Sequence, residues 1–419
     1  MNLWISIFFI AGYTLIALEH PLKLNKSAIA LLLAAGCWVL YGISAGGEFA
    51  LAELQGHLSG IAGIIFFLLG AMAIVELISV HNGFSVVSDL IRTANKRKLL
   101  WVTGFITFFL SAALDNLTTA IVMVSLVRKL IRERNERMVF AGIIVIAANA
   151  GGAWSPIGDV TTTMLWMGGQ VTGVNIVRRL FLPSMVSLIL PLAWQSLFIR
   201  KENTPVPAAD PEKKEPHSRL VFFTGLALLL SVPIFKTITH LPPYLGILSA
   251  LGIMWVITET IHHRHENRQH LRITHALTKI DHPGVLFFLG ILLAVAALDS
   301  SGILHSMADG LNRLTGNKDI IASMLGLLSA VVDNVPLTAA AMAMYPLSTF
   351  PPDSKLWELL AYTLGTGGSC LIIGSAAGVV VMGMEKINFF WYLRKITLTA
   401  LIGYFGGLAA YLLLFYLFG

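Results

Sequence analysis

Apolar runs of about 20 residues recur along almost the whole chain, separated by short polar segments. A run of this length crosses a bilayer as one α-helix. The first run has no basic residue before it and no small-residue cleavage site, so we interpret it as a retained span rather than a signal peptide. The pattern predicts an all-α polytopic membrane protein with spans at about 3–18, 27–43, 61–80, 138–169, 178–199, 219–236, 244–260, 283–300, 357–384 and 390–418.

Two further apolar segments, 99–127 and 319–347, do not fit the pattern of a simple span. The first has basic residues on both flanks, which favours the same side of the membrane for both ends. Two full spans would need about 40 apolar residues. We therefore predict a re-entrant hairpin over 99–131 that turns near Asp115-Asn116, and a counterpart over 319–347. Irregular backbone at this depth requires a covering of protein or a water-filled cavity.

The two halves of the chain resemble each other. The stretch LSAALDNLTTA matches LSAVVDNVPLTA, and NAGGAWSPIGD matches GTGGSCLIIGS. Each half, 1–200 and 219–419, would hold five spans and one hairpin, and an odd number of crossings inserts the second half upside down. We therefore predict an inverted repeat with interrupted helices at its centre. The polar, Pro-rich stretch 201–218 would be a flexible cytoplasmic linker.

The distribution of basic residues predicts how the chain is oriented in the membrane. The chain has 29 Lys and Arg residues and a formal net charge of +6. With the N- and C-termini outside, 23 of these basic residues fall in cytoplasmic loops, as the positive-inside rule expects. The basic excess therefore implies no nucleic-acid partner. The two cysteines lie in apolar runs, so we expect no disulfide framework.

Each half offers two backbone breaks at membrane depth, namely the hairpin tip and a Gly-rich interruption in the following span, 138–169 or 357–384. Unwound segments expose carbonyl groups, and hard cations take oxygen ligands. An aspartate at a tip could simply cap the next helix, but two at matching positions favour a functional role. We predict a cation- and proton-binding site formed by Asp115, Asn116, Asn149, Gly151, Ser155, Asp159, Asp333, Asn334, Thr338, Thr366, Gly367 and Ser369.

The predicted site is not symmetric, because Ser375 takes the place of Asp159 in the second half. We expect the first half to gather two carboxylates and to couple to protons, and the second half either to bind the cation more weakly or to have a mainly structural role. Each shell would be completed by the hairpin tip of its own half. The His-rich stretch 262–282 is interpreted as a solvated loop, with a pH sensor as the alternative. No His, Lys or Arg lies in mid-span, which disfavours a zinc- or His-based membrane enzyme and favours a cation over an anion.

The stretches SAALDNLTTAIVMVSLVRKLI, VIAANAGGAWSPIGDVTTTMLWMGG and LSAVVDNVPLTAAAMAMYPL closely resemble the NhaD-type sodium/proton antiporters of the ion transporter superfamily. The resemblance extends from about residue 60 to 400. It implies Na⁺ or Li⁺ export driven by H⁺ entry, a homodimer in a bacterial inner membrane, elevator-like movement, and no cofactor besides the transported ions. Na⁺ would bind at Asp115, Asn116 and Asn149, and at Asp333, Asn334 and Thr366.

The superfamily also contains arsenite and dicarboxylate carriers, which give the alternative function. Dicarboxylate carriers typically have Ser-Asn-Thr at the hairpin tips, whereas this chain has Asp115-Asn116-Leu117 and Asp333-Asn334-Val335. A carboxylate in place of a hydroxyl disfavours an anion and can hold either Na⁺ or H⁺. We therefore expect exchange by competition between the two ions at buried carboxylates.

Overall fold

The computed structural model describes residues 2–17, 19–91, 93, 95–199, 215–262 and 266–418. Within these residues every regular element is a helix, and seven helices are long and apolar enough to cross a membrane. Most of the predicted linker 201–218 lies outside the described residues, as do His263 and His265 of the predicted loop. The all-α membrane architecture expected from the sequence is confirmed.

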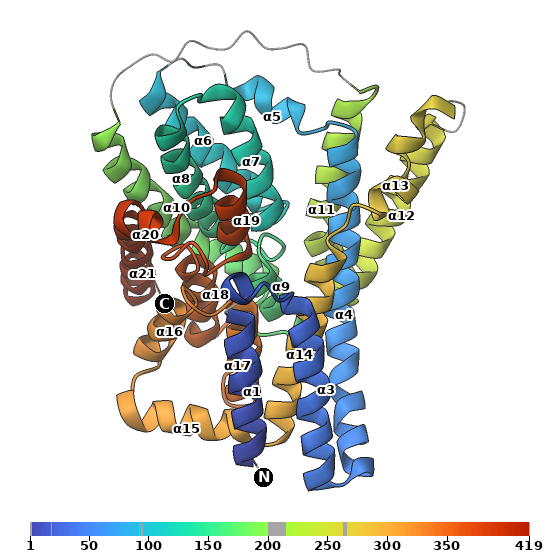
Figure 1. Ribbon diagram of the computed structural model, residues 1–419, viewed down its shortest axis with the longest axis vertical. Helices are drawn as coiled ribbons and strands as arrows, with labels where there is room; N and C mark the ends of the chain where they lie inside the picture. Colours follow the sequence, from blue (N-terminus) through green and yellow to red (C-terminus); the bar gives the residue numbers. More distant parts are fainter. Residues whose placement is uncertain are drawn as a thin grey trace.

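One set of helices, which we call the α4 group, includes the long helix α4 and the helices that pack beside it or beside its neighbours (Figure 1). Helix α14 packs along α3, while α11 and α12 pack against α4. The contact between α14 and α3 is close because Gly290 lies against the backbone of Ala30, where a Cβ would meet the Ala30 carbonyl carbon at 2.6 Å. The group comprises α1 (Asn2–Ala17), α3 (Lys26–Ala45), α4 (Gly47–Val80), α11 (Ser218–Thr239), α12 (Pro243–His262) and α14 (His282–Ser300).

A second set of helices forms the hairpin group. Helices α6 and α7 form one hairpin and α16 and α17 the other, and the two lie toward opposite ends of the molecule (Figure 1). Helices α10 and α21 pack side by side against them. The group comprises α6 (Lys96–Ser111), α7 (Asn116–Leu130), α8 (Arg134–Gly152), α9 (Val160–Met167), α10 (Gly173–Phe198), α16 (Lys318–Leu328), α17 (Asn334–Met344), α18 (Lys355–Gly367), α19 (Ala376–Glu385), α20 (Phe389–Lys395) and α21 (Thr397–Phe418).

The seven membrane-length helices account for seven of the ten predicted spans. The others are α1, which has only 16 residues, and the two interrupted spans, which divide into α8–α9 and α18–α19 as the Gly-rich motifs predicted. The hairpins turn at Asp115 and Asp333, immediately before α7 and α17.

Several boundaries were wrong. The span predicted to begin at residue 61 begins at Gly47, so α4 has 34 residues and is about 51 Å long, well beyond the roughly 30 Å of a hydrocarbon core. The final span is divided at Ile396. Segments interpreted as loops contain short helices: α2 (Glu19–Leu22), α5 (Ser85–Leu90), the 3₁₀-helix η1 (Glu266–Leu271), α13 (Ile273–Leu277) and α15 (Ile303–Thr315), which lies across one end of the molecule (Figure 1).

The two halves share a second feature besides their hairpins. An ion pair joins the first turn of each hairpin to the first turn of the interrupted span that follows it. Lys96 Nζ lies 2.7 Å from Glu136, and Lys355 Nζ lies 2.5 Å from Asp319. The basic residue is on the hairpin in the first half and on the interrupted span in the second. Both halves therefore have an ion pair at this place, with the positions of the acid and the base exchanged.

Candidate functional site

Each hairpin packs tightly on the interrupted helix of its own half. Ser111 Oγ donates a hydrogen bond to the Ala148 carbonyl at 2.6 Å, and Ser329 Oγ donates to the Leu364 carbonyl at 3.3 Å. These residues occupy matching positions in the two aligned motifs. The ends of α6 and α8, and of α16 and α18, are therefore held together beside the four breaks.

Two predicted site residues, Gly151 and Gly367, make this packing possible. A Cβ built on Gly151 would collide with the carbonyl oxygen of Phe108, and one on Gly367 would collide with that of Gly326. The collisions again fall at matching positions of the two halves. Glycine is needed here because two helix backbones touch.

Asp159 lies at the centre of the structure, where both hairpin tips reach it. Its side chain is 2% exposed. One carboxylate oxygen accepts a hydrogen bond from Asn116 Nδ2 at 3.1 Å, and the other accepts one from Asn334 Nδ2 at 3.3 Å. Asp159 is the N-cap residue of α9, yet it makes no side-chain capping bond to that helix. The side-chain hydrogen bonds of this carboxylate are therefore made with the two tip asparagines.

Asn149 extends the network into the second half. Its Oδ1 accepts a hydrogen bond from Asn116 at 3.0 Å, and its Nδ2 donates to Ser369 Oγ at 2.9 Å and to Ser375 Oγ at 3.0 Å. Asn149 is fully buried. The structure thus joins residues of both halves in one network, whereas the sequence suggested a separate shell in each half.

The tip aspartates Asp115 and Asp333 cap helices in this structure. Asp115 accepts hydrogen bonds from the backbone N–H and the hydroxyl of Thr118, both at 2.7 Å, and Asp333 accepts one from the Val335 N–H at 3.1 Å. Across the described residues, no group of three His, Cys, Asp or Glu side chains could hold a metal ion together. The capping alternative considered for these positions is therefore what their contacts show.

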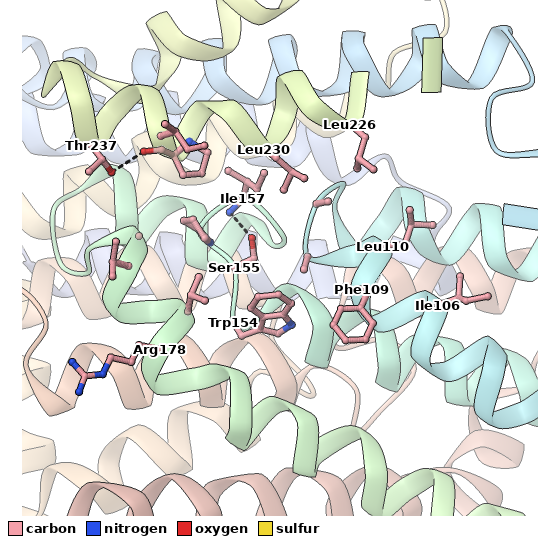
Figure 2. Close-up of a pocket in the computed structure, with 18 of the residues that line it drawn as sticks. Ile106, Phe109, Leu110, Trp154, Ser155, Ile157, Arg178, Leu226, Leu230 and Thr237 are labelled. Atoms are coloured by element: carbon pink, nitrogen blue, oxygen red, sulfur yellow. Dashed lines mark hydrogen bonds between the residues drawn. The ribbon is translucent and has the colours of Figure 1, made fainter. Parts of the chain in front are cut away.

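Three other predicted ligands have local partners. Thr338 and Thr366 donate their hydroxyl groups to backbone carbonyls one turn earlier, each at 2.7 Å. Ser155 lies in the wall of an apolar cavity of about 1010 Å³ between the α8–α9 break and α11. Figure 2 shows Trp154, Ser155 and Ile157 on one side of this cavity and Leu226 and Leu230 on the other. The Thr338 hydroxyl reaches only the backbone of Asn334, and among the described residues none of these three hydroxyl groups makes a hydrogen bond with a side chain of the Asp159 network.

Two buried acids were missed by the sequence analysis. Glu385, whose side chain has no exposed surface, is paired with Arg128 at 2.6 Å and with Arg137 at 2.7 Å. Glu358 accepts hydrogen bonds from Asn175 at 2.5 Å and from Tyr411 at 2.6 Å. Both lie in terminal turns of the second interrupted span. From sequence alone, an acid in such a turn is interpreted as a solvated residue at a helix end. An arginine lies beside each of them, since Arg179 is also 3.7 Å from Glu358, whereas the side-chain donors to Asp159 are neutral amides.

Helical hairpins and interrupted helices that meet at a buried polar centre are typical of secondary transporters. The family model described as "Citrate transporter" (CitMHS) matches residues 13–365. The chain is 52% identical to "Sodium/proton antiporter 1" of Arabidopsis thaliana over 97% of this chain and 71% of that protein. It is 32% identical to the "Na(+)/H(+) antiporter NhaD" of Alkalimonas amylolytica over 96% of this chain and 89% of the relative.

The chain therefore belongs to the NhaD-type sodium/proton antiporter family and to the wider citrate-transporter family, and it is a transporter rather than an enzyme. The resemblance drawn from the three motifs is confirmed. A solved structure shares the fold: the YdaH transporter of Alcanivorax borkumensis matches with a TM-score of 0.58 at 12% identity, over 94% of this chain and 99% of that one.

Proposed function

We propose that the protein exchanges Na⁺ for H⁺ by competition at Asp159. The observation that carries this proposal is a carboxylate only 2% exposed that contacts two amides and no described Lys, Arg or His. A buried carboxylate without a cationic partner is costly unless it binds a proton or a metal cation. Since one carboxylate cannot hold both, release of one ion accompanies uptake of the other. The sodium/proton antiporters among its relatives support this choice of ions.

The surrounding amides suit both states of such a site. In this structure Asn116 and Asn334 direct their NH₂ groups at Asp159. An amide can instead present its oxygen, and oxygen atoms are the ligands that hard cations prefer. Rotation of these two amides would let Asp159, Asn116 and Asn334 surround Na⁺ with oxygens. Asn149 would hold the Asn116 amide while Ser369 and Ser375 hold Asn149.

Everted vesicles test this function directly. A pH gradient is formed, Na⁺ is added, and a pH-sensitive dye reports whether the gradient collapses. We expect Na⁺ to collapse it, choline to leave it unchanged, and Asp159→Asn to lose the Na⁺ response completely while inserting normally. Li⁺ is expected to replace Na⁺. Asp309→Asn, which changes an exposed acid on α15, is the matched control and should behave like the wild type. An unchanged gradient in the wild type across neutral and alkaline pH would contradict exchange.

A second candidate function is transport of an anion such as a dicarboxylate. The N-termini of α7 and α17 point into the centre, and helix N-termini favour anions. The matching family model is also described as a citrate transporter. Thermal unfolding separates the two candidates, because a bound substrate raises stability. Stabilisation by citrate or arsenite, without an effect of Na⁺, would favour the anion carrier.

We further propose that residues 1–200 and 219–419 are inverted repeats and that the hairpin group moves as an elevator against the α4 group. The matched serine bonds, glycine contacts and polarity-reversed ion pairs support the repeat. The apolar wall between the α8–α9 break and α11 supports sliding, since few polar bonds would have to break there (Figure 2). A homodimer, a bacterial inner membrane and termini outside remain predictions.

A further inference from the structure

A second cavity, of about 700 Å³, lies where one end of α6, α8 and α10 meets the junction of α20 and α21. Its wall differs from that of the cavity in Figure 2 because it combines basic and aromatic side chains. None of the residues in the Asp159 network lines it. The residues that matter for its chemistry are Lys96, Trp194, Gln195, Trp391, Arg394 and Lys395.

The charge of this cavity is positive. Lys96 is neutralised by Glu136 at 2.7 Å. Arg394 and Lys395 both lie in the last turn of α20 and are exposed. Neither makes an ion pair with an acidic residue in the described parts of the chain. Two adjacent cations thus line one cavity with their charges available to an anion.

A buried polar group lies among the same residues. Gln195 is 8% exposed, and its Oε1 accepts a hydrogen bond from Thr399 at 3.3 Å. Its amide nitrogen has no hydrogen-bond acceptor among the described residues. The cavity therefore offers an NH₂ donor beside the two cations.

Part of the wall is apolar and exposed on the surface. Trp194 is 37% exposed, Phe198 65% and Leu398 57%. On a membrane protein such side chains meet the acyl chains, and Trp residues gather where hydrocarbon gives way to headgroups. The cavity is thus open both to hydrocarbon and to a cationic rim.

We propose that this cavity binds one anionic phospholipid of the adjoining leaflet. Arg394 and Lys395 would bind the headgroup phosphate, Gln195 would donate a hydrogen bond to an ester or phosphate oxygen, and the acyl chains would lie along Trp194, Phe198 and Leu398. Basic pockets between transmembrane helices bind anionic headgroups in this way. The site joins the start of the first hairpin to the second half, so the lipid would stabilise the hairpin group.

The test is lipid binding by the purified full chain, measured independently of ion exchange. Phosphatidylglycerol and phosphatidylcholine with identical acyl chains are titrated while thermal unfolding is followed, and native mass spectrometry counts bound lipids. We expect phosphatidylglycerol to raise the unfolding temperature and phosphatidylcholine to have little effect. The double variant Arg394→Gln/Lys395→Gln should bind phosphatidylglycerol roughly thirtyfold more weakly, from the loss of two surface cations.

Arg132→Gln is the matched control, since Arg132 is an exposed cation in the α7–α8 connection and does not line the cavity. It should keep the wild-type affinity. Equal loss in this control, or an unchanged affinity in the double variant, would overturn the proposal. Glycerol phosphate is tested in the same way. If this soluble anion raises the unfolding temperature as much as phosphatidylglycerol does, the cavity binds a free phosphate and not a lipid.

Discussion

At the scale of residues, three acids at the backbone breaks have different hydrogen-bond partners. Asp159 contacts amides from both hairpin tips, whereas Asp115 and Asp333 cap the helices that follow them. The two caps are themselves unequal. Asp115 is held by two hydrogen bonds from Thr118, and Asp333 is held by one from Val335. A carboxylate that caps a helix lies beside the site and makes its hydrogen bonds with that helix instead of with the network.

Substitution by asparagine separates the charge of these two aspartates from their capping role, because Asn and Asp are similarly good N-caps. We expect Asp115→Asn to abolish Na⁺-dependent exchange and Asp333→Asn to leave part of it, with poorer apparent Na⁺ affinity. The reason is that Asp115 shares the half that contributes Asp159. Exchange rates over a range of Na⁺ concentration and pH measure the difference.

The matched controls for these variants are Asp115→Ala and Asp333→Ala, which remove both charge and cap. Each should additionally lower helix stability by about 1 kcal/mol. Equal loss of exchange in Asp115→Asn and Asp333→Asn would show that the two halves contribute equally.

At the scale of elements, backbone contact fixes how each hairpin meets its interrupted helix. Gly151 touches the carbonyl of Phe108, and Gly367 touches that of Gly326. A side chain at either position must push two helices apart. Because the same helices end at the site, their separation would also displace Asn149 and the hairpin tip.

Gly151→Ala is therefore expected to destabilise the protein by about 1–3 kcal/mol through overpacking, and to impair exchange. Thermal unfolding in detergent and the vesicle assay measure the two effects. Gly310→Ala is the matched control, because a Cβ on this helical glycine meets nothing within 4 Å. It should be neutral or slightly stabilising, since alanine favours the helix. Wild-type stability in Gly151→Ala would mean that α6 and α8 can separate freely.

A pair of histidines joins the end of α4 to the end of α12. Nδ1 of His81 lies 2.7 Å from the Leu77 carbonyl, and its Nε2 lies 2.9 Å from Nε2 of His262. Burial lowers the pKa of His81, and nearby His270 and His217 lower it further, while the Leu77 carbonyl and Glu215 act in the opposite direction. The stretch interpreted as a solvated loop thus begins with a buried histidine, His262.

The lowered pKa of His81 predicts a loss of stability in acid. The unfolded chain takes up a proton near pH 6.5, before folded His81 does, so the stabilisation is complete above that pH and is lost as the pH falls toward the folded pKa. We expect the unfolding temperature to fall between pH 7.5 and pH 5.5 more steeply in the wild type than in His81→Gln. The exposed His240→Gln is the control and should keep the wild-type slope. Equal slopes in all three proteins would exclude this effect.

At the scale of the whole molecule, the sequence was sufficient for features that repeat or that depend on hydropathy. Paired motifs placed both hairpin turns at Asp115 and Asp333 and located both interrupted spans. Hydropathy could not show that α4 begins at Gly47, because its outer part is mixed in polarity. Nor could a comparison of halves show that Asp159 is reached by Asn334, since that contact depends on how the halves pack.

The hydrogen bonds that cross between the halves have a consequence for how such a protein changes over generations. Asn334 contacts an acid 175 positions away in the sequence, and Asn149 contacts serines more than 200 positions further along. The effect of a substitution in one half therefore depends on the residues of the other half, so the two halves cannot change independently at these positions. Asp159 contacts the hairpin tips of both halves, so the second half has no need of an acid at the matching position. That position is Ser375, whose hydroxyl accepts a hydrogen bond from Asn149.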